Sequence, residues 1–303
     1  MSGRWFAAAK WIVSIGVLLL IVQWFSGIEN PEKIWSSITG LPVYIHSLAF
    51  LCAAANWMLE SAKWRYLLTH LQPISFPVSL KSTFSGAAVS HLIPFRVGEY
   101  LGRAYFLEEQ NRIPALMINY FGAICQSLIT LIIGIPAAYI MLGHQAQPAV
   151  HKALWVLLIV LIAVFSIGML KPQWRKMPNW LDNALKGFSQ LNKKQMFAGI
   201  GLSALRYLVF SGWYAFLITY TGIAPYQSAI MGVAAIFFLQ TFTPGMVITD
   251  AAVRLALPAL VFATPPAAQP LLLGIAVMNY FYNVLLPGFV GLVVILSQKR
   301  FRK

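Results

Sequence analysis

The sequence predicts an all-α integral membrane protein with about six transmembrane helices and two re-entrant, broken helical hairpins in an inverted repeat. Of the 303 residues, 59% are hydrophobic and only 10% are charged, whereas a typical soluble domain has about 25% charged residues. The mean hydropathy is +0.72. The apolar residues gather in segments of roughly 20 residues, which is the length that crosses a bilayer as a helix.

Six of these segments are expected to be simple spans. They are residues 5–25, 41–59, 115–142, 153–170, 197–220 and 271–296, the last interrupted by Pro287-Gly288.

The polar intervals are too short to build a second core, so we expect one membrane domain over residues 1–303. Residues 1–40 would hold the first span and an outer loop. Residues 41–170 and 197–303 would be two repeat halves, joined by a cytoplasmic linker at residues 171–196.

Two further apolar regions, residues 76–110 and 225–263, carry charges and a proline near the middle. Pro94 and Pro244 would break a helix there, because proline lacks an N–H and clashes with the preceding turn. We therefore expect two hairpins that each enter and leave on one side. Irregular backbone at membrane depth is tolerated only where it is buried in protein or lines a cavity, so the breaks indicate a cavity.

Basic residues predict the orientation. With both termini in the cytoplasm, nearly all loop Lys and Arg fall on the cytoplasmic side, as in the linker 171–196 and the C-terminal residues 299–303. This is the distribution that the positive-inside rule requires. The net charge of +14 therefore indicates a membrane surface rather than nucleic acid.

The two broken regions share a pattern of a proline, an acid, and an arginine four residues after the acid. The members are Pro94, Glu99 and Arg103 in the first region, and Pro244, Asp250 and Arg254 in the second. The four-residue spacing places acid and arginine on one helix face. Three predicted spans lie between the hairpins, so the hairpins enter from opposite sides. Interrupted segments at corresponding positions of two halves are typical of a transporter's substrate site. The alternative is that each acid and arginine form a local ion pair, which cancels their charges and lets a polar helix pack in the bundle.

The first of these motifs resembles the Pro-x-Arg-x-Gly-Glu-x-x-x-Arg pattern of the lysylphosphatidylglycerol synthase transmembrane family, the flippase region of the multiple peptide resistance factor. The residues that carry the resemblance are Pro94, Arg96, Gly98, Glu99 and Arg103. In the second half the family has a Pro-Gly-Gly-x-Gly run followed by Glu. This chain has Pro244-Gly245 there, with Asp250 as the acid.

The resemblance implies a protein of the bacterial cytoplasmic (inner) membrane that moves or binds phospholipids, anionic or aminoacylated. It does not imply aminoacylation, which belongs to a separate soluble domain in the multiple peptide resistance factor. The expected function is lipid translocation of a flippase or scramblase kind. The alternatives are a non-transporting accessory subunit, working with a membrane or cytoplasmic enzyme of envelope or lipid synthesis, and a small-solute or ion-coupled transporter.

Arg96, Arg103 and Arg254 are candidates to hold a lipid phosphate, because a guanidinium fork matches phosphate oxygens in two bonds. The plainer interpretations are snorkelling to headgroups or pairing with the acids alone. Glu99 and Asp250 would meet a cationic headgroup or take up a proton; the plainer interpretation is a salt bridge. Hairpin breaks are expected at Pro94, Gly98, Pro244 and Gly245.

Other polar residues in apolar segments are secondary candidates: Asn56, Glu60, Lys81, His91, Arg206, Asn279 and Asn283. The plainer interpretation of Glu60, together with Lys63 and Arg65, is an interfacial anchor at the inner end of their span. That of His91 is a buried hydrogen-bonding residue. Asn279 and Asn283 would form hydrogen bonds between helices.

The motifs of catalysis are missing from the sequence. It contains no HExxH or GxSxG motif, and its two cysteines, Cys52 and Cys125, lie apart in apolar segments. We therefore expect no metal, no other cofactor and no enzymatic activity.

Overall fold

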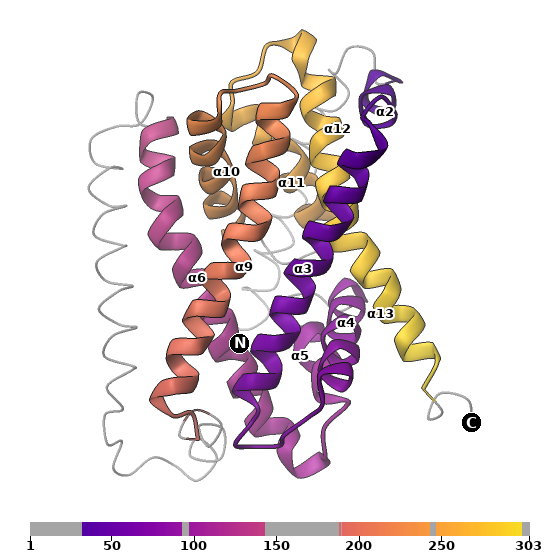
Figure 1. Ribbon diagram of the computed structural model, residues 1–303, viewed down its shortest axis with the longest axis vertical. Coiled ribbons are helices and arrows are strands. Elements are labelled where there is room, and N and C mark those ends of the chain that lie inside the picture. The colour runs from indigo at the N-terminus through magenta and orange to yellow at the C-terminus, as the bar shows by residue number, and fades with distance from the viewer. Residues whose placement is uncertain (1–31, 93–96, 143–187, 189, 243–246, 299–303) are drawn as a thin grey trace, which may run out of the picture.

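The structure is a computed structural model that describes residues 32–92, 97–142, 188, 190–242 and 247–298. All the regular structure of these residues is helical, and most helices run along the long axis of the molecule (Figure 1). The prediction of an all-α protein is confirmed for this part of the chain.

Three helical stretches are long and apolar enough to cross a membrane: Glu109–Met141, Lys193–Tyr220 and Pro266–Leu296. They coincide with three of the predicted spans. The predicted spans at residues 5–25 and 153–170 lie outside the described residues, so the count of six stays a prediction.

A fourth span arises when α2 (Glu32–Thr39) and α3 (Val43–Leu67), which meet at 87°, are counted together. Helix α3 packs lengthwise against α9 (Lys193–Tyr220) in the middle of the bundle. The predicted end of this span at residue 59 is wrong. The helix continues for about two more turns, because Glu60 and Lys63 form ion pairs inside the bundle instead of ending the helix at an interface.

The first predicted hairpin consists of α4 (Phe76–Leu92) and α5 (Val97–Ala104), which pack against each other. Gly98 and Gly102 lie on the face of α5 that touches α4, where a Cβ would overlap the backbone of α4. These glycines let the two backbones approach closely, as small residues do between membrane helices. The second limb stops short of the predicted end at residue 110, because α6 (Glu109–Leu142) has already begun there.

The second predicted hairpin consists of α10 (Tyr226–Gln240) and α11 (Val247–Val261), which also pack against each other. Figure 1 shows this hairpin in the upper half of the molecule and α4 and α5 in the lower half. An inverted repeat requires this opposition. The repeat itself stays a prediction, because the segment 153–170, on which the number of intervening spans depends, is outside the described residues.

The last predicted span is irregular. It consists of the turn η1 (Pro266–Ala268), α12 (Gln269–Tyr280), a π-helical turn η2 (Phe281–Leu285) and α13 (Leu286–Leu296). The interruption expected at Pro287-Gly288 therefore falls one turn earlier, since a proline disturbs the hydrogen bonds of the turn before it. Helix α13 packs tightly on α4, where a Cβ on Gly291 would overlap the carbonyl of Phe84.

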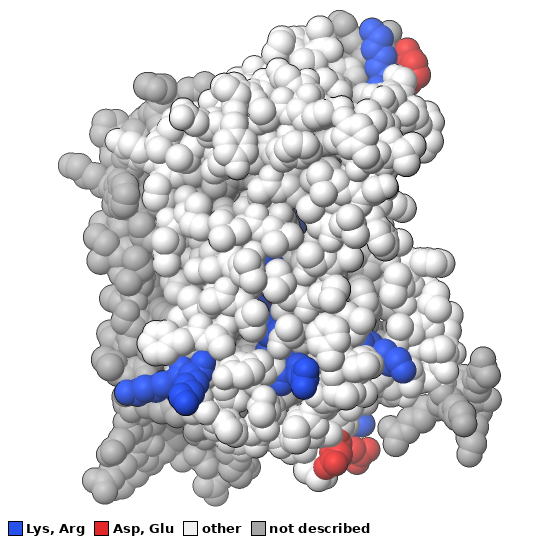
Figure 2. Space-filling view, in the orientation of Figure 1, with Lys and Arg blue, Asp and Glu red and all other residues white. Residues whose placement is uncertain are grey.

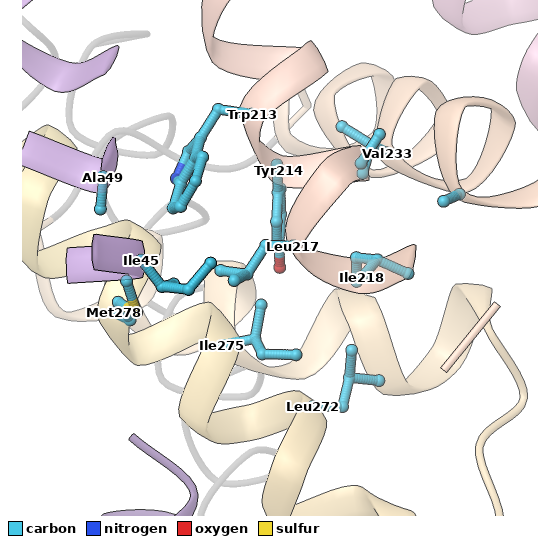
Figure 3. Close-up of a cluster of buried hydrophobic side chains, with 12 residues drawn as sticks. Ile45, Ala49, Trp213, Tyr214, Leu217, Ile218, Val233, Leu272, Ile275 and Met278 are labelled. Atoms are coloured by element: carbon cyan, nitrogen blue, oxygen red, sulfur yellow. The ribbon is translucent and has the colours of Figure 1, made fainter. Parts of the chain in front are cut away.

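A core of buried apolar side chains joins α3, α9, α10 and α12 in the upper half. Figure 3 shows Trp213, Tyr214 and Leu217 of α9 packed with Ile45 of α3 and Ile275 of α12. The outer faces of the helices are also apolar. Leu208, Phe289 and Leu296, for example, are more than half exposed. A contiguous apolar exterior is what lipid contact requires and what soluble monomers avoid.

On one face of the molecule (Figure 2), most of the charged surface lies toward the two ends. On the face shown in Figure 2, Lys and Arg gather toward the lower end, and a nearly uncharged band separates them from one acid–base pair at the upper end. Helix α2 carries Glu32 and Lys33, and it lies at the upper end. Among the described residues, the exposed Lys and Arg of the opposite end are Arg65, Lys81, Lys193 and Lys194. The band has the apolar character of a membrane-embedded surface.

Candidate functional site

Glu60 of α3 lies at the centre of a buried charged cluster. Its Oε1 accepts a hydrogen bond from Arg103 Nη2 at 2.9 Å, and its Oε2 lies 2.8 Å from both Lys63 Nζ and Arg206 Nη1. The side chains of Glu60 and Arg103 are only 7% and 2% exposed. Cations from α3, α5 and α9 thus converge on one carboxylate. The interpretation of Glu60 and Lys63 as an interfacial anchor is wrong, because both are buried in the bundle.

Glu99 is the second carboxylate of the cluster. Its Oε1 accepts a hydrogen bond from the same Arg103 Nη2 at 2.6 Å, and its side chain is 32% exposed. Among the described residues the cluster therefore has three cations, Lys63, Arg103 and Arg206, and two carboxylates. With all five ionised, one positive charge is in excess. An uncompensated buried charge costs several kcal/mol of free energy (roughly 3–5), so the cluster favours an additional anion.

Neighbouring groups hold the three cations in place. Lys63 Nζ donates to the carbonyl of Gly122 at 3.3 Å and to Ser203 Oγ at 3.4 Å. The guanidinium of Arg103 lies 5.6 Å from the ring centre of Trp64, and that of Arg206 lies 5.9 Å from the ring of Trp57. These are distances at which a cation is attracted to an aromatic face.

Gly86 of α4 makes room for Arg103. A Cβ at this glycine would lie 2.9 Å from Arg103 Cγ and 2.8 Å from the carbonyl oxygen of Glu99. The Nε of Arg103 is buried and has no hydrogen-bond partner among the described residues. One donor of the most buried cation thus has no acceptor within the described part of the chain.

A line of amide side chains leads from the cluster toward the second hairpin. Arg206 Nε donates to Asn56 Oδ1 at 2.8 Å, and Asn56 Nδ2 donates to Asn283 Oδ1 at 3.3 Å. Asn283 Nδ2 in turn donates to Asn279 Oδ1 at 3.0 Å. Asn283 belongs to the π-helical turn η2, and its carbonyl accepts from Trp57 Nε1 at 3.2 Å. The irregular turn therefore presents both its side chain and its backbone to α3.

The line ends at a small hollow beside the second acid–arginine pair. Arg254 Nε donates to Asp250 Oδ2 at 2.7 Å, and both side chains are partly buried. Arg254 lines a hollow of about 20 Å³ together with Asn279 and Asn283. This volume holds about one water molecule. Arg254 and Arg103 therefore do not share one pocket, and Arg206, Asn56 and the two other amides lie between them.

The remaining predicted site residues lie elsewhere. Lys81 is exposed at the lower end of the molecule. His91 Nδ1 donates to the carbonyl of Ala87 at 2.6 Å, and the ring packs on Gly288 of α13. Gly98 packs on α4, as described above. The residues Pro94, Arg96, Pro244 and Gly245 lie outside the described part of the chain.

Lys63 was not predicted to be a member of the cluster. Asn56, Glu60 and Lys63 follow one another at spacings of four and three residues in an apolar segment, which places them on one helix face. This was the available signal. Within the described ranges, no group of His, Cys, Asp and Glu side chains could hold a metal ion.

A helical bundle with an apolar outer band and an interior line of ionisable and amide side chains defines a helical membrane protein with a polar path through its core. The sequence profile described as "Lysylphosphatidylglycerol synthase TM region" matches residues 11–297, and the chain belongs to this family. The resemblance seen in the first hairpin motif is thereby confirmed, and the family implies a membrane protein involved in lipid handling. A search of curated proteins finds no match.

Proposed function

We propose that this protein binds phospholipid headgroups in its interior and moves them between the leaflets of the bacterial cytoplasmic membrane. The observation that carries the proposal is the line of polar side chains that runs from Glu99 to Arg254. Ionisable residues inside a membrane protein are costly and by default mark a functional pathway. An ion pair with a purely structural role would not need a row of hydrogen-bonded side chains that connects it to a second acid–arginine pair.

Arginines stand at both ends of this line. Each guanidinium presents a planar fork that suits the two oxygens of a phosphate. A headgroup would leave Arg103, pass the amides of Asn56 and Asn283, and reach Arg254, while its acyl chains stay in the bilayer along the apolar outer faces.

The polar line is closed to a lipid headgroup in this conformation. A hollow of about 20 Å³ is far smaller than a phospholipid headgroup, so transport requires helices to move apart. Two opposed hairpins that rock against the rest of the bundle would open the line to one side at a time, as in other repeat-built transporters. The π-helical turn η2 contributes Asn283 to the polar line, and such turns are frequent at functional sites.

The end that carries Arg65, Lys193 and Lys194 would face the cytoplasm, together with both chain termini. The first hairpin then opens inward and the second outward. The protein would carry out transport without catalysis, driven by a gradient or by a partner.

A proteoliposome assay with fluorescently labelled phosphatidylglycerol tests the proposal. Asn283→Leu removes the hydrogen bonds to Asn56 and Asn279 with little change of volume, so we expect at least a tenfold loss of transport with folding retained. Arg112→Gln is the matched control, because Arg112 pairs with Glu109 at the surface. The proposal fails if wild-type protein moves no anionic, zwitterionic or aminoacylated lipid faster than empty liposomes do.

One observation favours a non-transporting accessory subunit instead. An open hollow of about 830 Å³ lies at the basic end, lined among others by Gln72, Lys81 and Arg112. Its size suits a segment of a partner enzyme. Two results together would support the accessory-subunit alternative. Wild-type protein would transport no lipid, and an enzyme that copurifies with wild-type protein would be lost from the Lys81→Glu variant.

A further inference from the structure

The two carboxylates that bind Arg103 are not equivalent. Both accept from the same atom, Nη2. Glu60 is held by three cations and is almost fully buried, whereas Glu99 has Arg103 as its single ion-pair partner among the described residues and is 32% exposed. Loss of the Glu99 contact would leave Arg103 still paired with Glu60. Glu99 is therefore the carboxylate that can leave without releasing the cation.

The charge of the cluster changes when Glu99 leaves. The three cations and Glu60 alone have two positive charges in excess, against one with Glu99 bound. A protonated Glu99 has the same effect, because a neutral carboxylic acid is a far weaker acceptor for a guanidinium than a carboxylate is. The hydrogen that Nη2 then frees, together with the Nε of Arg103, which has no partner among the described residues, offers two donors to an incoming anion.

We infer that Glu99 is an exchangeable counter-ion of Arg103, which a phosphate with one negative charge replaces while Glu99 takes up one proton. The inference rests on the proposed function and names the charge of its substrate: an anionic phosphodiester. Anion and proton bind together, and by linkage each strengthens the binding of the other. The only covalent change is the proton transfer: an O–H bond forms on Glu99 at its exposed edge, and the buffer acid in the surrounding water loses that proton.

The titratable groups of the cluster and of the helices packed on α5 define the controls. Glu60, Lys63, Arg103 and Arg206 belong to the cluster, Tyr100 lies beside Glu99 in the sequence, and α4 carries Lys81 and His91. Helix α6 adds Glu109 and Arg112, which pair with each other. His91 is the member of this set whose type ordinarily titrates between pH 5 and 8, so its removal separates its contribution from that of Glu99.

Isothermal titration calorimetry of the purified full chain, in buffers of different ionisation enthalpy, counts the protons taken up on binding. The probes are dihexanoyl phosphatidylglycerol, dihexanoyl phosphatidylcholine and dimethyl phosphate, a phosphodiester with fixed charge. We expect wild type to take up close to one proton per phosphatidylglycerol, and its affinity to rise about tenfold per pH unit lowered where Glu99 is ionised in the free protein. Glu99→Gln should bind at least as tightly, without proton uptake and without pH dependence. His91→Gln and Glu109→Gln should behave like wild type.

Each outcome has a separate meaning. Phosphatidylglycerol binding without proton uptake, or uptake that persists in Glu99→Gln, overturns this inference and leaves the proposed function standing. Phosphatidylcholine carries the same singly charged phosphodiester, so its binding with the same proton uptake supports the exchange with Glu99 and extends it to zwitterionic lipids. Dimethyl phosphate that binds as tightly as the lipid, with the same uptake, retains Glu99 as counter-ion but argues for a soluble phosphate ester against a lipid. No binding of any probe at any pH overturns both proposals. If Glu99→Gln does not fold, the numbers of protons taken up by wild type and by His91→Gln still test the inference. Equal uptake of about one proton supports it, and loss of uptake in His91→Gln overturns it.

Discussion

At the residue scale, the two acids of the cluster differ in their number of ion-pair partners and in their burial. Glu60 binds Lys63, Arg103 and Arg206 and is nearly inaccessible, while Glu99 binds Arg103 at an exposed edge. Removing one partner of a buried ion pair is destabilising because it leaves the other charge unpaired. The stability of the fold should therefore depend on Glu60 and much less on Glu99.

We expect Glu60→Gln to lower the free energy of unfolding by about 3–5 kcal/mol, because Lys63 and Arg206 would lose their carboxylate partner and the buried Arg103 would keep Glu99 alone. Glu99→Gln should cost clearly less, because Arg103 keeps Glu60. Thermal unfolding of the two variants in the same detergent, followed by circular dichroism, measures the difference. Equal destabilisation by both substitutions would contradict the assigned roles.

The pairs within one helix could be predicted from the sequence, and the cluster could not. The four-residue spacing predicted Glu99–Arg103 and Asp250–Arg254, and the ion pairs are present at 2.6 Å and 2.7 Å. Glu60 was assigned to an interface because two of its three cations, Arg103 and Arg206, come from α5 and α9, far away in the sequence. A local pattern contains no information about which distant helix supplies a counter-charge.

At the element scale, the contact between α4 and α5 positions Arg103. Gly98 and Gly102 bring the two backbones together, and Gly86 leaves the space that Arg103 occupies. The proline pattern predicted both hairpins. It did not predict how short α5 is, because helix length there depends on packing against α4 and on the start of α6.

Gly86→Ala should push α5 away from α4, because the new Cβ would lie within 3 Å of both Arg103 Cγ and the Glu99 carbonyl oxygen. We expect a destabilisation of about 1–3 kcal/mol, the usual cost of overpacking, and a loss of lipid transport. Gly201→Ala on α9 is the matched control, since no atom lies within 4 Å of its added Cβ. It should be neutral or slightly stabilising, because alanine favours helix more than glycine does. Equal effects of both substitutions would mean that the close approach is unimportant.

At the scale of the whole molecule, the mechanism depends on which end faces the cytoplasm. Ser36 on α2 and Thr69 just after α3 are exposed at opposite ends of the bundle. The basic residues lie at the Thr69 end, so the positive-inside rule places that end in the cytoplasm. The first hairpin, which follows Thr69, would then receive lipid from the inner leaflet.

Single cysteines test this orientation. In a background with Cys52→Ala and Cys125→Ala, we expect Ser36→Cys to react with a membrane-impermeant maleimide in intact spheroplasts, and Thr69→Cys to react only after permeabilisation. The reverse result would show that the protein has the opposite orientation. The first hairpin would then take lipid from the outer leaflet, and Glu99 would exchange protons with the solution outside the cell. Labelling of both sites from one side would mean that α3 does not cross the membrane, and a polar line along α3 and α9 could then not carry a headgroup between leaflets.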